Sequence, residues 1–92
     1  MMGFTLVKSA PGYEKSVYYD LQRTTGVRDV YRLFGEFSFF LILQAEERRG
    51  LDRALDTIRR MDDVSGMGPL MVTSEGDLLA SSLREMGSSA AF

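Results

Sequence analysis

The fold is decided by the stretch VRDVYRLFGEFSFFLILQA, which occupies residues 27–45. Two apolar segments flank a loop that contains Gly35, a pattern that predicts a β-hairpin. Side chains alternate between the two faces of a strand, yet every residue from 39 to 43 is apolar. Both faces of the second hairpin strand therefore need to be covered.

In the segments around the hairpin, apolar residues recur alternately at the spacing of a strand and at the spacing of a helix. The predicted order is strand 3–9, helix 13–23, strand 27–34, strand 38–45, helix 51–61 and strand 64–74, with a polar loop over 46–50. This βαββαβ order predicts an α+β, ferredoxin-like fold. Right-handed crossovers then place both helices on one face of a four-stranded antiparallel sheet.

Two features concern the C-terminal third of the chain. Pro69 lies inside the last predicted strand and has no N–H to donate, so this strand should lie at a sheet edge or carry a bulge there. The domain is predicted to span residues 1–76, and residues 77–92 are predicted to form a short helix and a tail.

The sheet face opposite the helices is expected to pair with a second copy of the chain. Neither helix can reach that face, and an exposed apolar patch of this size marks an interface. The residues predicted to form it are Tyr31, Leu33, Phe40 and Ile42. Whether Phe40 or Phe39 points outward depends on the register, because a slip of one residue exchanges the faces.

Composition narrows the function classes. The chain has 92 residues, enough for one domain, with 45% hydrophobic and 26% charged residues and a net charge of −2. Acidic and basic residues are interspersed, so no clustered basic surface for direct nucleic-acid binding is expected. The chain contains no cysteine and no histidine, and we expect neither a metal nor another cofactor. The N-terminal apolar run is too short for a membrane span, and a cytoplasmic location is expected.

Five short motifs follow one another without large gaps between residues 4 and 75. They are VKSAPGYE from Val7, LQRTTGV from Leu21, Val30-Tyr31, Gly35-Glu36-Phe37 and IRRMDDV from Ile58. In this order and spacing they resemble the effector-binding domain of Lrp/AsnC regulators, also called the RAM domain. The resemblance implies a ferredoxin-like fold, dimers formed through the sheets, rings of dimers, and small amino acids bound between dimers. The chain would be a stand-alone version, without the helix-turn-helix that normally precedes this domain.

A ligand site is expected where the hairpin loop of one dimer meets the turn before the last strand segment of another. Glycine-rich turns expose backbone groups that can hold a carboxylate and an ammonium. The predicted ligand-binding residues are Gly35, Glu36, Phe37, Ser38, Met67 and Gly68. The family usually has Asp at the position of Ser38, and hydroxyl residues where Met67 and Pro69 stand. Free amino acids are therefore expected to bind weakly, at about millimolar Kd.

An enzyme of the dimeric α+β barrel type is the alternative interpretation, since it uses the same fold and sheet pairing around an interior pocket. Such an enzyme would normally place a histidine or another polar group in its cavity. This chain offers mainly phenylalanine, leucine and methionine there. We therefore favour a ligand-binding or regulatory module that assembles with itself, and we assign no catalytic residue.

Overall fold

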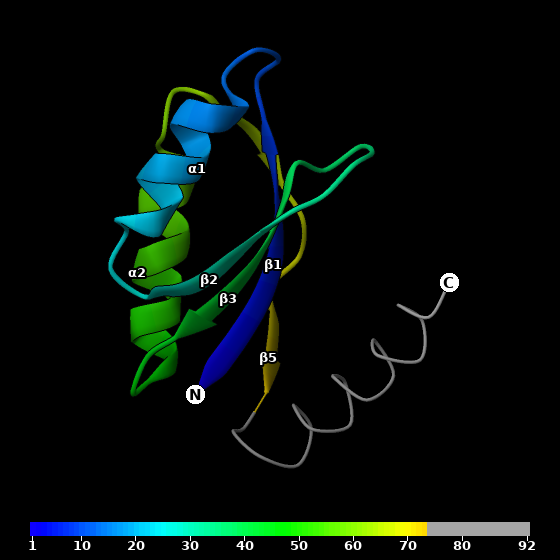
Figure 1. The fold of residues 1–92 in the computed structure, drawn as a ribbon. Coiled ribbons are helices and arrows are strands. Elements are labelled where there is room, and N and C mark those ends of the chain that lie inside the picture. The colour runs from blue at the N-terminus through cyan, green and yellow to red at the C-terminus, as the bar shows by residue number, and fades with distance from the viewer. Residues whose placement is uncertain (74–92) are drawn as a thin grey trace.

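The computed structural model describes residues 1–73 of the chain. It has five strands and two helices in the order β1-α1-β2-β3-α2-β4-β5 (Figure 1). Their bounds are β1 Met2–Ser9, α1 Glu14–Gln22, β2 Val27–Arg32, β3 Phe39–Gln44, α2 Arg48–Arg59, β4 Val64–Met67 and β5 Met71–Thr73. The predicted short helix and tail over 77–92 lie outside the described residues.

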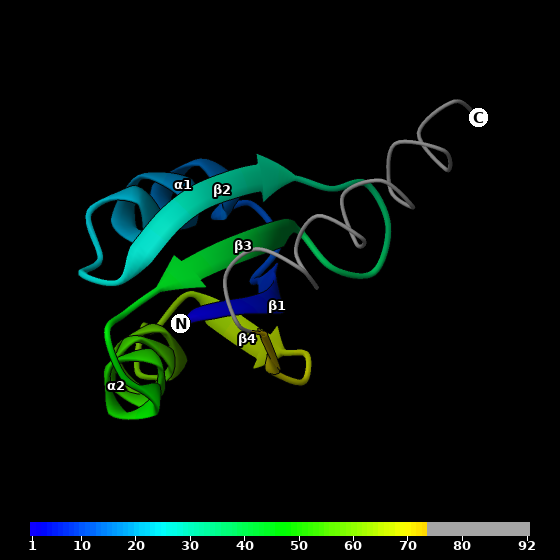
Figure 2. The ribbon, with the colours of Figure 1, turned by 90° about the horizontal axis from the view of Figure 1, so that it is seen from below.

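The sheet is antiparallel with the strand order β2-β3-β1-β4, and β5 also pairs with β1 (Figure 2). Both helices lie on one face of it, α1 against β2 and α2 against β3 and β4 (Figure 1). The α+β ferredoxin-like fold predicted from the order of elements is therefore confirmed.

The last predicted strand is broken into two pieces, so the sheet has five strands rather than the predicted four. β4 and β5 both pair with β1, on the edge that β3 leaves open, and residues 68–70 separate them. Pro69 is in this gap, where its missing N–H interrupts no ladder. The predicted edge position of this strand is confirmed, and the strand is interrupted at Pro69.

The second helix begins earlier than its apolar stripe indicates. Residues 48–50 were expected in a polar loop, but α2 already starts at Arg48. Arg48 and Arg49 in the first helical turn are exposed to solvent, so their charges do not conflict with helix formation. Gly50 lies where α2 passes close to the end of β3, since a Cβ added there would be 2.5 Å from the Cβ of Ala45.

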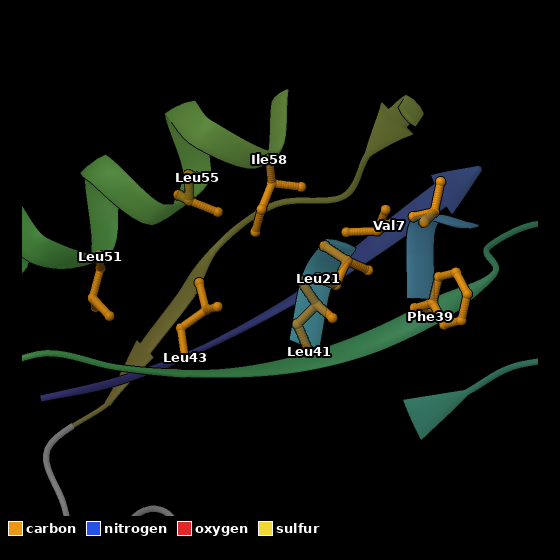
Figure 3. Close-up of a cluster of buried hydrophobic side chains, with 9 residues drawn as sticks. Val7, Leu21, Phe39, Leu41, Leu43, Leu51, Leu55 and Ile58 are labelled. Atoms are coloured by element: carbon orange, nitrogen blue, oxygen red, sulfur yellow. The ribbon is translucent and has the colours of Figure 1, made fainter. Parts of the chain in front are cut away.

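The core lies between the sheet and the two helices (Figure 3). On β3 the odd-numbered residues face it, and Phe39 is 1% exposed. This decides the register: Phe39 points to the helices and Phe40 to the opposite face, which we call the open face. The core consists of Val7, Val17, Leu21, Phe39, Leu41, Leu43, Leu51, Leu55 and Ile58.

Candidate self-association surface and ligand-binding loops

Three aromatic rings from three neighbouring strands pack together on the open face. The rings of Phe4 on β1 and Phe40 on β3 are stacked, with centroids 5.8 Å apart and an interplanar angle of 10°. The ring of Tyr31 on β2 lies 6.2 Å from that of Phe40 at an angle of 37°. Tyr31 pairs directly with Phe40 across the strands, which places both side chains on this face. We call these three residues the aromatic cluster.

Three of the four residues predicted for the interface lie on the open face. Tyr31, Phe40 and Ile42 belong to it by strand pairing, and Leu33 follows directly after the end of β2. Tyr31 is 52% exposed, whereas Ile42 is only 8% exposed within the single chain. Ile42 therefore has little surface left to bury against a partner.

Sequence reasoning missed three apolar contributors to the open face: Phe4, Leu6, which pairs directly with Phe40, and Met71. Phe4 is opposite Met71 in the β1–β5 pairing, and Met71 is 66% exposed. The alternation along β1 could have indicated Phe4, because residues 3–9 were already predicted to be a strand. The position of Met71 on the open face depends on how the chain pairs with β1 again after Pro69, and no local sequence pattern indicates this.

The hairpin loop projects from the sheet on the side away from the helices (Figure 1). The backbone N–H of Leu33 donates to the Ser38 carbonyl at 2.8 Å and closes the loop. Gly35 has φ +139°, a value that residues with a Cβ rarely adopt, and Phe34 beside it is 93% exposed. Glu36 is exposed at the tip. The loop therefore presents backbone groups, one carboxylate and one aromatic ring to solvent.

Ser38 fixes the base of this loop to the neighbouring strand β1. Its N–H donates to the Val7 carbonyl at 2.8 Å, and its Oγ accepts a hydrogen bond from the Ser9 N–H at 3.0 Å. Ser9 is 5% exposed, so this oxygen satisfies a buried donor. The hydroxyl of Ser38 is thus engaged within the chain.

Met67 and Gly68 lie on the other side of β1. Met67 pairs with Val7 and packs against the core, so its side chain points toward the helices. The Gly68 N–H donates to the Leu6 carbonyl at 2.8 Å, and its carbonyl accepts from Thr5 Oγ1 at 3.1 Å. Both backbone groups of Gly68 are therefore already paired.

The structure does not bring the two groups of predicted ligand-binding residues into contact within one chain. Ser38 hydrogen-bonds to one edge of β1 and Met67 pairs with the other edge. Two strand spacings, about 10 Å, separate the chains on either side of a central strand. A site that uses both groups would need loops from two copies.

Among residues 1–73, neither helix is long and apolar enough to cross a membrane. The same residues contain no group of three or more His, Cys, Asp or Glu side chains that could hold a metal ion.

Solved structures share this fold across most of the chain. The crystal structure of FFRP-DM1 is similar with a TM-score of 0.71 and 23% sequence identity, over 79% of this chain and 97% of that chain. The hypothetical protein PHS023 from Pyrococcus horikoshii is similar with a TM-score of 0.69 and 21% identity, over 80% of this chain and 92% of that one. No family model and no curated protein matches the sequence.

The E. coli protein AsnC is similar to this chain over only part of its own length. The TM-score is 0.69 and the identity 15%, over 83% of this chain and 53% of AsnC. The chain therefore spans about half of AsnC and nearly all of the two shorter proteins. At these identities the likeness shows the fold, which is the fold that the sequence motifs imply.

The role of Ser38 as a structural acceptor can be tested by stability. Ser38→Ala removes the acceptor of the buried Ser9 N–H, and we expect the free energy of unfolding to fall by about 1–3 kcal/mol. Urea denaturation at fixed protein concentration measures this change. The matched control is Ser65→Ala on the other side of β1, where an exposed hydroxyl donates to the Lys8 carbonyl; we expect a change within about 0.5 kcal/mol. Equal effects of the two substitutions would contradict this role.

Proposed function

We propose that this chain is a regulatory module of the Lrp/AsnC effector-domain type, which self-associates through the open face and binds a small ligand between copies. The observation that carries the proposal is the aromatic cluster of Phe4, Tyr31 and Phe40 on the face opposite both described helices. The motifs read from the sequence support the family assignment, and the similarity of the fold to AsnC agrees with it.

Self-association is supported by the chemistry of the open face. Aromatic residues are enriched at the centres of protein interfaces, because they bury a large apolar area with few rotatable bonds. Tyr31 and Met71 lie at opposite margins of this face, on β2 and β5, and each exposes half or more of its surface. A second copy that placed its own open face against this one would bury both margins. Such an arrangement has the twofold symmetry of most homodimers.

The ligand is proposed to bind where the loop residues 35–38 of one dimer approach residues 67–68 of another. The carboxylate of Glu36 forms no ion pair among the described residues, so it is available to an ammonium group. The backbone of Gly35 and Phe37 offers further donors and acceptors. Because the Ser38 hydroxyl and both Gly68 backbone groups are already paired, the loop tip has to provide most of the contacts.

The proposal assigns no catalytic step to the chain. Its sequence contains neither histidine nor cysteine, the commonest general base and the strongest nucleophile of enzymes. The face on which a dimeric barrel enzyme would build its cavity carries mainly phenylalanine, tyrosine, leucine, isoleucine and methionine. The carboxylate that strand pairing places on it, Asp29, forms an ion pair with Arg28 at 3.6 Å. Nothing in the described residues favours the enzyme over the module.

The interface can be tested with Phe40→Glu. A carboxylate in the aromatic cluster would be desolvated by a partner sheet, so the assembly should dissociate to monomers that remain folded. Light scattering measures the mass, and circular dichroism reports the fold.

Two control variants make this test specific. Tyr19→Glu changes an aromatic residue that is 50% exposed on α1, and it should leave the mass unchanged. Phe39→Glu puts a carboxylate in the core and should unfold the chain instead. A wild-type monomer at micromolar concentration would contradict the proposed interface. An unchanged mass for Phe40→Glu would contradict it as well.

The ligand proposal predicts weak binding of free amino acids. With the Ser38 hydroxyl engaged and no hydroxyl at residues 67 and 69, we expect Kd values of about 1 mM. Calorimetric titration with the twenty amino acids measures them, and Glu36→Gln should abolish whatever binding is found. Micromolar affinity would contradict the expectation that Ser38, Met67 and Pro69, which differ from the family pattern, weaken amino-acid binding. Unchanged binding in Glu36→Gln would place the site elsewhere.

A further inference from the structure

A groove of about 640 Å³ lies between the turn after α1, the end of β3 and one side of α2. It is at the end of the hairpin strands opposite to the loop 33–38, because β2 begins beside it at Val27 and ends at Arg32. Six residues of strand separate the two ends by about 20 Å. The groove is therefore distinct from the ligand-binding loops of the proposed function.

Small residues form the base of the groove and bring its walls together. A Cβ added to Gly26 would lie 3.0 Å from the Cβ of Ala54 on α2, and Gly26 has φ +95°. Ala45 and Gly50 also line the groove, and they are in close contact with each other. Side chains larger than these would fill the space, so the groove depends on glycine and alanine at these positions.

The rim of the groove carries positive charge and hydroxyl groups. Arg23 comes from the end of α1 and Arg53 from α2, and no acidic residue lines the groove. Arg23 has a partner, since its guanidinium pairs with Asp20 at 3.0 Å. Arg53 forms no ion pair within residues 1–73, because the acids of α2 pair with other arginines: Asp52 with Arg48 and Asp56 with Arg59.

Three threonines add hydroxyls to the same rim, and one of them has its proton available. Thr24 Oγ1 donates to the Asp20 carbonyl at 2.8 Å, and Thr57 Oγ1 donates to the Arg53 carbonyl at 3.0 Å. The hydroxyl of Thr25 forms no hydrogen bond within the described part of the chain. It can therefore donate to a ligand beside the two guanidinium groups.

We propose that this groove is a site for a small organic anion, a phosphorylated or polycarboxylate metabolite held by Arg53, Arg23 and Thr25. The planar guanidinium group binds the oxygens of phosphate and carboxylate alike, often through two parallel hydrogen bonds. The volume lies within the range of about 300–1,000 Å³ that is usual for small-molecule sites, so an organic anion fits better than a bare inorganic ion. The site goes beyond the proposed function and does not depend on self-association.

Titrations of the full chain with pyrophosphate and with citrate, followed by the backbone amide resonances, test the proposal. Saturable shifts should be confined to residues 23–26, 44–45 and 50–57, and the tighter of the two probes identifies the anion class. Arg53→Gln should weaken that probe about tenfold, the usual effect of losing a charge-assisted hydrogen bond. Thr25→Val should weaken it by a smaller factor without changing the charge.

The control is Arg49→Gln, which removes the same charge from an exposed residue of the same helix that does not line the groove. Affinity in this variant should stay within about twofold of the wild type, since exposed charges are largely screened. An equal loss in Arg49→Gln and Arg53→Gln would show a nonspecific response to net charge and overturn the site. The absence of saturable shifts at millimolar probe would also overturn it.

One further arm separates this site from the proposed function. The monomeric Phe40→Glu variant should bind the same probe with unchanged affinity, because every lining residue belongs to one chain. Loss of binding in that variant would contradict a groove complete in a single copy. If Arg53→Gln loses affinity for the probe while the assembly stays intact, the result supports the groove independently of the proposed interface.

Discussion

The rest of the structure depends on β3 being apolar on both faces. Phe39, Leu41 and Leu43 are buried beneath the helices, which occupy one side of the sheet. The other side of the same strand carries Phe40 and Ile42, and the neighbouring strands add aromatic rings to it. A strand of this kind is stable when both of its faces are covered. The hydrophobic effect thus favours the ferredoxin-like layers within one chain, and the apolar open face is the basis for the proposed contact between chains.

The central strand β1 links this face to the loops that could bind a ligand. On one edge of β1, the Val7 carbonyl accepts a hydrogen bond from the Ser38 N–H, and the Ser9 N–H donates to the Ser38 hydroxyl. On the other edge, the Leu6 carbonyl accepts from the Gly68 N–H, and the Thr5 hydroxyl donates to the Gly68 carbonyl. These bonds hold the bases of both loops in place, and the exposed tip at residues 34–36 remains the part of the hairpin that can meet another molecule.

Much of the fold could be predicted because its determinants are local. Apolar periodicity indicated both helices and the hairpin, and Pro69 indicated the interruption at the sheet edge. The register of β3 could not be decided, since Phe39 and Phe40 are the same residue type and only the packing of α1 and α2 distinguishes them. The structural role of Ser38 was also hidden, because its partner Ser9 is 29 residues away in sequence.

The groove beside α2 escaped prediction for a similar reason. Its two arginines are thirty positions apart in sequence and meet only when the turn after α1 packs on α2. In the sequence, Arg53 is one of several charges on a helix that alternates acids and bases. The pairing of Asp52 and Asp56 with other arginines is what leaves its guanidinium available.

The central claim is that two copies meet through their open faces, and nuclear Overhauser effects between differently labelled copies test it most directly. In an equal mixture of isotope-labelled and unlabelled chains, contacts between copies give cross-peaks that one chain alone cannot produce. We predict such cross-peaks among the ring protons of Phe4, Tyr31 and Phe40 and the methyl group of Met71. Cross-peaks between copies that involve only residues of α1 and α2, with none from these four side chains, would contradict the account.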